Sequence, residues 1–473
     1  MTVYILGGGP AGLALAQGLA EAGSSTRFIV FEGAAAVGGL AQTLKWGDHG
    51  AHDLGPHKIF TLDDQLMKRV EGLLPPSEWL DRPKSSRIWM RNCFLPYPPS
   101  PLALARVYGV RAFARMVRDY ALAQGRMLLP HEPPKTFAAD LELRVGSGLL
   151  ELLFTPIAQK LWGDPRELDT KLSRGRVQTP KLREVAANLL GTRRKSAFEA
   201  LTFRYPRGGI GNLWRSIQER TREKGEFLCG HRVTSLRVEE GRATALQTRI
   251  GDGGEQREWV IGTDDFVFST IPIRALLGVM GEWAKPDLLS SANSALRFND
   301  LLLVFLKLKR ASLLDESWVF VPDPAVAFHR VSEQESFDPG MTPDGTIVCC
   351  EIMSHADRPF AQRTDRELVD TAVQGLETMG YRDLAVVDSR VIRLPQSYPV
   401  YLAGFGKDLE KVLQALDQVS NVRSLGRQGA FNYIGTLDAM DMGYGAARWF
   451  TAGRDTNAWA QERVRTALYP VLD

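Results

Sequence analysis

Apolar and polar positions near the N-terminus follow a regular order. Residues 3–6 (VYIL) form an apolar run that predicts a buried strand, and residues 11–22 are rich in alanine and leucine, which predicts a helix. Residues 27–32 (RFIVFE) predict a second strand that ends in an acid. A strand, a helix and a second strand in this order indicate a parallel α/β unit.

The rest of the chain alternates between helical, strand-like and proline-rich stretches. The residues NCFLPYPPS (92–100) are typical of an extended link that is punctuated by prolines. Helical patterns follow at about residues 101–125, 136–161 and 180–200. Further strands are predicted at residues 231–248, 265–272 and 301–310.

Three glycines connect the first predicted strand to the first predicted helix. Gly7, Gly9 and Gly12 fit the pattern G-x-G-x-x-G. In that pattern the first glycine allows a tight turn, the second lets the backbone approach phosphates, and the third lets the helix pack on the strand. Pro10 and Ala11 open the helix, whose free N–H groups would hold a pyrophosphate.

An acid ends the second predicted strand. Glu32 stands 20 residues after Gly12, which is the spacing at which a carboxylate bonds a ribose hydroxyl. The turn and the acid together predict a dinucleotide-binding domain. At this point both NAD and FAD stay open.

Composition narrows the classes of function. A chain of 473 residues favours two or three domains, and a net charge of +3 gives no general case for nucleic-acid binding. The four cysteines are not spaced as a zinc site or a disulfide framework. We therefore expect a reduced, cytoplasmic protein without a metal site. No apolar run is long enough for a transmembrane helix, and no signal peptide is predicted.

A group of arginines stands on one face of a predicted helix. Arg111, Arg115 and Arg118 follow helical spacing, whereas Val110 and Val117 lie largely on another face. Such a helix suits a peripheral contact with a membrane or an anionic substrate. A solvated face of a surface helix is the simpler alternative.

A second glycine pair follows the acidic strand end. The stretch GAAAVGGLAQT contains Gly38, Gly39 and Leu40. It resembles the FAD-binding signature of the superfamily of amine oxidases, phytoene desaturases, protoporphyrinogen oxidases and UDP-galactopyranose mutases. The resemblance implies that these three residues lie beside the diphosphate and ribityl chain of a bound FAD. It decides between the two dinucleotides in favour of FAD.

Two further stretches resemble the galactopyranose mutases. DLGPHKIF implies that His57 lies near the flavin, where a neutral imidazole would bond the ring system or a substrate oxygen. KLWGDPRELDTKLSRGRV implies that Trp162 borders a sugar-nucleotide site and that an arginine just beyond it contacts the diphosphate. Arg174 and Arg176 both fit this second role, and Arg176 is favoured.

The resemblance continues through the middle of the chain. FHRVSEQESF implies a second diphosphate contact at Arg330. FRYPRGG implies that Tyr205 lies where two domains meet and binds the substrate. The strand that follows implies a backbone contact of Val233 with adenine. Tyr398 and Tyr401 in QSYPVYLAGF would bond sugar or phosphate oxygens, or simply pack.

The C-terminal stretch SLGRQGAFNYIGTLDAMDMGYG resembles the segment that closes the flavin site in the same superfamily. It implies that Gly426, Arg427, Asp441 and Met442 contact FAD and that a final helix begins under the flavin pyrimidine. Tyr433 would face the sugar. The link from Tyr433 to the acids that follow is slightly longer here than in the mutases.

These patterns predict an α/β fold in which a Rossmann-like FAD-binding domain of the glutathione reductase type carries an inserted mixed α+β substrate domain and a helical cap. The FAD-binding domain is expected to be discontinuous and to consist of residues 1–70, 203–272 and 420–473. The helical cap is expected at residues 71–202 and the substrate-binding lobe at residues 273–419.

The resemblance implies an FAD-dependent oxidoreductase that acts on a small molecule, such as an anionic or nucleotide-linked sugar. The alternative is a non-redox pyranose/furanose mutase, in which N5 of the reduced flavin is the nucleophile. His57, Tyr205 and Tyr433 are the candidates for acid–base work, and Arg176 and Arg330 would stabilise a leaving diphosphate. Because the chain has one full dinucleotide fingerprint, an NAD(P)H reductant would have to share the substrate cleft. The sequence leaves the substrate and the oligomeric state open.

Overall fold

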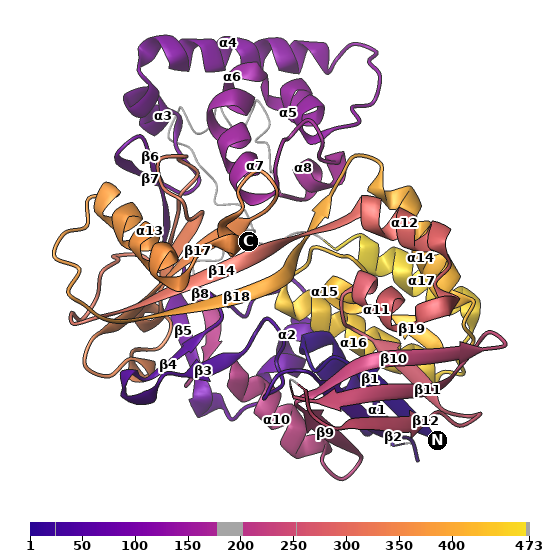
Figure 1. Ribbon diagram of the computed structural model, residues 1–473. Coiled ribbons are helices and arrows are strands. Elements are labelled where there is room, and N and C mark those ends of the chain that lie inside the picture. The colour runs from indigo at the N-terminus through magenta and orange to yellow at the C-terminus, as the bar shows by residue number, and fades with distance from the viewer. Residues whose placement is uncertain (24, 177–201, 252, 470–473) are drawn as a thin grey trace.

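The N-terminal strand lies inside a five-stranded parallel sheet. The computed structural model describes residues 1–23, 25–176, 202–251 and 253–469 (Figure 1). The strand order is β19-β13-β1-β2-β9, and each pair of neighbours is parallel. The strands are β1 (Thr2–Leu6), β2 (Arg27–Glu32), β9 (Gly225–Cys229), β13 (Phe266–Ser269) and β19 (Val422–Ser424). Segments that are far apart in sequence therefore build one dinucleotide-binding sheet.

Two helices pack closely beside this sheet. They are α1 (Pro10–Glu21) and α16 (Thr436–Thr451). A Cβ atom added at Gly443 would lie 2.2 Å from the carbonyl oxygen of Ala11, and one added at Gly18 would lie 2.6 Å from Cβ of Ala447. Only glycine allows the two helices to approach so closely, which fixes α16 against the first glycine turn.

A second, seven-stranded sheet crosses the middle of the molecule (Figure 1). Its order is β18-β14-β17-β16-β15-β6-β7, and its pairs are antiparallel except for β15 with β6. The strands are β6 (Ser86–Met90), β7 (Cys93–Pro96), β14 (Leu296–Leu308), β15 (Trp318–Phe320), β16 (Arg330–Glu333), β17 (Thr346–Ser354) and β18 (Val386–Tyr401). Helix α13 (Asp365–Thr378) packs on this sheet through Leu368, Ala372 and Leu376.

A group of helices forms the top of the molecule in Figure 1. They are α3 (Pro101–Tyr108), α4 (Val110–Arg126), α5 (Phe137–Val145), α6 (Ser147–Leu149), α7 (Thr155–Leu161) and α8 (Thr170–Arg176). A π-helical turn (Leu150–Phe154) joins α6 to α7. The predicted helix at residues 180–200 lies outside the described residues.

The predicted cap differs from the structure at its beginning. Strands β5 (Trp79–Pro83), β6 and β7 occupy a stretch that was expected to be helical cap or extended link. Arg91 and Asn92 have φ values of 50° and 58°, so a two-residue turn with positive φ at both positions connects β6 to β7. The hairpin completes the seven-stranded sheet. The division of the chain into three regions stays a prediction.

Smaller elements complete the fold. The strands are β3 (Thr43–Lys45), β4 (Ala51–Asp53), β8 (Thr202–Pro206), β10 (His231–Glu239), β11 (Arg242–Ile250) and β12 (Gln256–Val260). The helices are α2 (Asp64–Glu71), α10 (Gly211–Thr221), α11 (Ile273–Val279), α12 (Pro286–Ala295), α14 (Phe405–Asp417), α15 (Gly426–Gly429) and α17 (Thr456–Ala467). Among the described residues, no helix combines the length and apolar character needed to cross a membrane.

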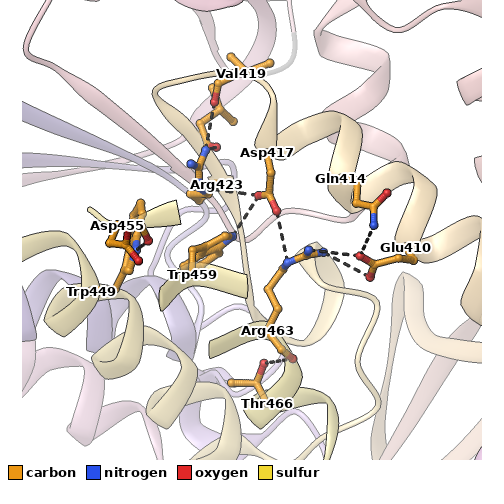
Figure 2. A network of polar contacts seen from close by, with 11 residues as sticks. Glu410, Gln414, Asp417, Val419, Arg423, Trp449, Asp455, Trp459, Arg463 and Thr466 are labelled. Atoms are coloured by element: carbon orange, nitrogen blue, oxygen red, sulfur yellow. Dashed lines mark hydrogen bonds and ion pairs between the residues drawn. The ribbon is translucent and has the colours of Figure 1, made fainter. Parts of the chain in front are cut away.

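A polar network ties the C-terminal helix to the strand that leads into α15 (Figure 2). Asp417, at the end of α14, accepts a hydrogen bond from Nε1 of Trp459 at 3.0 Å and forms ion pairs with Arg423 and Arg463. Arg423 lies on β19, directly before the segment that begins at Gly426. The network therefore fixes the position from which α15 begins.

Candidate active site

The first glycine turn forms an open cradle at the start of α1. Gly7 has a φ of +104°, and a Cβ atom added at Gly12 would lie 2.2 Å from the carbonyl oxygen of Gly7. The N–H of Leu13 donates to the carbonyl of Gly9, and no side chain of the described residues caps the N-terminus of α1. The N–H groups of this first turn are thus placed to hold an anion.

The second glycine pair lies directly against the first turn. The N–H of Gly38 donates to the carbonyl of Gly8 at 2.8 Å. A Cβ atom added at Gly39 would lie 3.0 Å from Cα of Gly9, and both glycines of the pair have positive φ. The predicted residues Gly38 and Gly39 therefore share one cradle with the first turn.

Glu32 lies at the edge of this cradle. Its Oε2 accepts a hydrogen bond from the N–H of Gly8 at 2.9 Å, and its Oε1 accepts one from Ala34 at 2.8 Å. Burial raises the pKa of the Glu32 carboxyl. Arg232 on β10 lies beside Gly33, so the neighbouring backbone of Val233 stands close to the acidic strand end. This is the arrangement expected for an adenosine site.

A third segment joins the cradle from the C-terminal part of the chain. Gly426 has a φ of +86°, and a Cβ atom added there would lie 3.0 Å from Cβ of Ala11. The next residue, Arg427, places its guanidinium 4.8 Å from the ring centre of Tyr398 and 4.7 Å from that of Tyr433. Arg427 thus connects the glycine cradle to a group of aromatic residues.

That aromatic group is compact. The ring centres of Tyr398 and Tyr433 are 5.2 Å apart, and those of Trp162 and Tyr433 are 6.4 Å apart. Trp162 is 4% exposed, and its indole Nε1 has no hydrogen-bond partner among the described residues. A buried N–H without a partner is costly, so this N–H is available as a donor to a ligand or to a water molecule.

Arg330 lies near the same group and is held by a buried acid. Its Nε and Nη2 bond the two carboxylate oxygens of Glu351 at 2.5 and 2.8 Å. Glu351 is 1% exposed. The guanidinium of Arg330 therefore already makes a two-point ion pair. Its role as a diphosphate contact stays a prediction.

Glu351 is not among the residues predicted from the sequence, although its position in an apolar strand indicates a role. Strand β17 is buried at every position, and Glu351 is the one ionisable acid in its sequence TIVCCEIMS. A lone carboxylate in an apolar strand needs a partner, and antiparallel register places it directly opposite Arg330 of β16.

His57 bonds the second glycine turn. Its Nε2 lies 3.1 Å from the carbonyl oxygen of Leu40 and 3.2 Å from that of Leu54. Two carbonyl acceptors require that Nε2 carries the proton, which leaves Nδ1 as a hydrogen-bond acceptor. Burial, with the nearby charges of Arg330 and Arg427, lowers the pKa of His57 to about 4. His57 is therefore neutral at neutral pH.

The depressed pKa of His57 makes stability depend on pH. Between pH 6.5 and about 4 the unfolded chain binds a proton at His57 that the folded chain does not, so the free energy of unfolding falls as pH is lowered. We expect the change His57→Gln to reduce that slope by up to about 1.4 kcal/mol per pH unit. Urea unfolding at pH 4.5, 5.5, 6.5 and 7.5 measures it, and identical slopes in both proteins would contradict the assignment.

Lys160 fixes the two sides of the site to each other. Its Nζ lies 2.5 to 3.2 Å from the backbone carbonyl oxygens of Val321, Asp323, Val326 and Phe328, which share its N–H donors. Burial, together with the positive charge of Arg358, lowers the pKa of Lys160 to about 6, and the charge of Asp323 opposes this shift. Lys160 precedes Trp162 on the chain, and Phe328 precedes Arg330. The lysine therefore ties the segment of Trp162 to the segment of Arg330.

Three predicted substrate residues lie outside this group. The hydroxyl of Tyr205 is fully buried and donates to Asp53 at 2.6 Å, so the predicted substrate contact is not supported. The hydroxyl of Tyr401 accepts from the N–H of Tyr433 at 2.7 Å, and thereby supports the loop of Tyr433. Arg174 forms an ion pair with Asp140 and is exposed. The side chain of Arg176 lies outside the described residues.

Two predicted cofactor residues face elsewhere. Asp441 stands on the side of α16 that faces α17, and its Oδ2 bonds Arg465 and Tyr469 at 2.5 Å each. Met442 is buried in the core between α16 and the five-stranded sheet. The structure therefore does not support a cofactor contact through the side chain of either residue. Gly443 on the same helix makes the close contact with α1 instead.

Comparison with known families decides the class of this site. Residues 99–408 match the family of flavin containing amine oxidoreductases, and residues 5–72 match the NAD(P)-binding Rossmann-like domain. The chain belongs to the flavin containing amine oxidoreductase family. Members of this family are flavin enzymes, and the cofactor of this chain is FAD.

Solved structures agree with the family in fold. A crystal structure of reduced UDP-galactopyranose mutase superposes with a TM-score of 0.82 at 21% identity and covers 99% of this chain and 98% of that chain. A protein from Exiguobacterium sp. 255-15 that is named as a protoporphyrinogen oxidase gives 0.71 at 18% identity, with coverages of 95% and 98%. Cyclohexylamine oxidase from Brevibacterium oxydans IH-35A gives 0.65 at 17%, with coverages of 95% and 98%. At these low sequence identities, the similarity shows a shared fold and does not identify the substrate.

The residues of the glycine cradle fit the cofactor of the family. The cradle has backbone N–H groups at a helix N-terminus, glycines where a Cβ atom would collide, and an acid at the strand end. His57 bonds the carbonyl of Leu40 beside this cradle, and Arg427 connects the cradle to the aromatic group. A flavin held by the cradle would therefore have neutral, cationic and aromatic side chains within reach.

Proposed function

We propose that the protein is an FAD-dependent oxidoreductase that acts on an anionic sugar, and specifically on a nucleotide-linked sugar. The observation that carries the substrate class is the position of Arg427, whose guanidinium lies against Tyr398 and Tyr433 next to the glycine cradle. The guanidinium of Arg427, the hydroxyls of the two tyrosines and the buried indole N–H of Trp162 are together suited to a ligand that is rich in oxygen atoms.

The residues of the site have distinct proposed roles. Arg427 provides positive charge for a diphosphate, and Arg330, which is oriented by its ion pair with Glu351, provides guanidinium N–H donors. Trp162 and Tyr433 border the sugar, and Trp162 offers its N–H as a donor. Neutral His57 accepts a hydrogen bond at Nδ1 and thereby positions a hydroxyl of the substrate. FAD, when bound, supplies the redox chemistry at a substrate C–H bond.

A sugar mutase is the second candidate. The specific observation in its favour is that the fold of UDP-galactopyranose mutase covers nearly the whole of this chain, including the segments of Trp162, Arg330 and Tyr433. In a mutase the reduced flavin supplies a nucleophile rather than an electron sink. The same arginines would then stabilise a departing diphosphate, so the two candidates differ in the state of the flavin and in the product.

One experiment separates the candidates. Purified holoenzyme is mixed anaerobically with UDP-galactose, UDP-glucose, dTDP-glucose or cyclohexylamine, once with oxidised flavin and once after reduction by dithionite. Loss of flavin absorbance in the oxidised sample supports the oxidoreductase. Isomerised sugar in the reduced sample, without net flavin oxidation, supports the mutase. Bleaching by cyclohexylamine but by none of the nucleotide sugars would overturn the proposed substrate class.

Removal of the Arg427 charge tests the substrate contact. We expect Arg427→Met to lower kcat/KM for the active nucleotide sugar about 20-fold, because a half-buried cation is lost from the site. Arg257→Met is the matched control, since Arg257 stacks on Trp259 at 3.9 Å on the exposed strand β12. Equal kinetics of both variants and the wild type, at full flavin content, would remove Arg427 from the proposed site.

A further inference from the structure

Exposed apolar side chains gather at one end of the molecule. Of the 17 large hydrophobic residues that are exposed among the described residues, seven lie between Leu102 and Leu129. They are Leu102, Val110, Val117, Leu122, Met127, Leu128 and Leu129. Leu128 is 87% exposed and Val110 is 80% exposed. Such a concentration in one short segment indicates an interaction site.

Helix α4 carries two parallel stripes on its exposed side. Val110, Ala114, Val117 and Ala121 follow each other at helical spacing and are all exposed. Arg111, Arg115 and Arg118 are displaced from them by one position and are exposed too. The opposite side of α4 is buried through Met116, Tyr120 and Ala123. The exposed side is therefore half apolar and half basic.

The net charge of this segment is positive. Residues 102–129 contain Arg106, Arg111, Arg115, Arg118 and Arg126, all of them exposed, and a single acid, Asp119. Asp119 is 5% exposed and pairs with Arg115 and Arg118, and Arg115 also bonds Glu151 of the π-helical turn. We name the exposed apolar and basic side chains of residues 102–129 the α4 surface.

We propose that the α4 surface docks onto a bilayer that contains anionic phospholipids. A membrane interface has two layers, with phosphate groups above and acyl chains below. The arginines would contact the phosphate groups, and the apolar side chains beside them would contact the acyl chains. Helix α4 runs along the top edge of the molecule, and the five-stranded sheet lies at the other end (Figure 1). Docking in this direction leaves the FAD-binding end in water.

The residues after α4 would enter the membrane furthest. Met127, Leu128 and Leu129 are consecutive and exposed, and Arg126 directly precedes them. Burial of an apolar side chain of this size in the interface is favourable, and each arginine adds attraction to anionic headgroups. The apolar contribution is insensitive to salt and the basic one is weakened by it, so the two can be measured separately.

Vesicle flotation with the full-length holoenzyme tests the proposal. The probes are vesicles of phosphatidylcholine alone and vesicles of phosphatidylcholine with phosphatidylglycerol. We expect the enzyme to float with the anionic vesicles only, and to do so less at high salt. Arg111→Gln with Arg118→Gln should weaken binding about fivefold for each arginine removed. Leu128→Ser with Leu129→Ser should weaken it at every salt concentration.

A matched variant controls for surface chemistry in general. Val260→Ser with Val464→Ser removes two apolar side chains that are 76% and 63% exposed but lie outside the α4 surface. It should float like the wild type. Equal flotation of all variants, or absence of the enzyme from anionic vesicles, would overturn the proposal. So would self-association in sedimentation velocity that the Leu128→Ser/Leu129→Ser variant abolishes, since a second copy would then cover the surface.

Discussion

Replacement of Gly12 by alanine is expected to yield protein that has lost its flavin. The added Cβ atom would lie 2.2 Å from the carbonyl oxygen of Gly7, and the chain at Gly7 cannot move away easily because Thr270 packs against it. The turn would have to open, which would misplace the N–H groups that hold the diphosphate. We expect the Kd for FAD to rise at least about 100-fold, which is about 2.7 kcal/mol.

The measurement is the ratio of flavin to protein after purification, followed by titration of the apoprotein with FAD. Gly406→Ala is the matched control, because a Cβ atom at Gly406 would meet nothing within 4 Å and no positive φ is required there. It should bind FAD like the wild type. A Gly12→Ala protein that is purified with a full complement of FAD would show that this turn does not hold the cofactor.

The change Lys160→Met is expected to have the largest effect on stability. It removes an ammonium group that donates to four backbone carbonyls, and the carbonyls of Val321 and Phe328 would be left buried without this donor. A buried carbonyl that loses its donor costs about 1–3 kcal/mol, and we expect the free energy of unfolding to fall by about 4 kcal/mol. Because Lys160 connects the segments of Trp162 and Arg330, activity should fall even where the variant is folded.

Lys307 provides the control for this change. It is 3% exposed, and its ammonium group donates to the carbonyls of Pro343 and His49, outside the aromatic group. We expect Lys307→Met to cost about 2 kcal/mol and to leave kcat/KM unchanged at temperatures where it is folded. Urea unfolding and steady-state kinetics test both. If the two variants lose activity alike, Lys160 has only a general structural role.

Local sequence was enough to predict the cofactor end of the molecule. The glycine turn, the first helix and Glu32 lie within one short stretch, and each residue acts through backbone geometry that its neighbours determine. The second glycine pair is close in sequence as well as in space, because the N–H of Gly38 bonds Gly8. In short motifs of this kind, residues that are close in sequence determine the local backbone geometry.

The opposite holds for the substrate end. The pairing of Arg330 with Glu351 depends on the register between β16 and β17, which no local pattern determines. Asp441 shows the same limit on a helix, since only the packing of α17 decides that its carboxylate faces Arg465. Tyr205 is predicted to bind the substrate, whereas in the fold its hydroxyl donates to the buried carboxyl of Asp53. Burial raises the pKa of Asp53 to about 6, and the tyrosine supplies a donor there.

We propose that the aromatic group of Trp162, Tyr398 and Tyr433, next to the glycine cradle, binds a nucleotide-linked sugar. Titration of the oxidised holoenzyme with UDP-galactose, UDP, galactose and cyclohexylamine, followed by the shift of the flavin absorbance spectrum, tests it most directly. We expect a saturable shift with UDP-galactose and with UDP, a much weaker one with galactose, and loss of the UDP response in Arg427→Met. A shift with cyclohexylamine alone would contradict the account and place the substrate among amines.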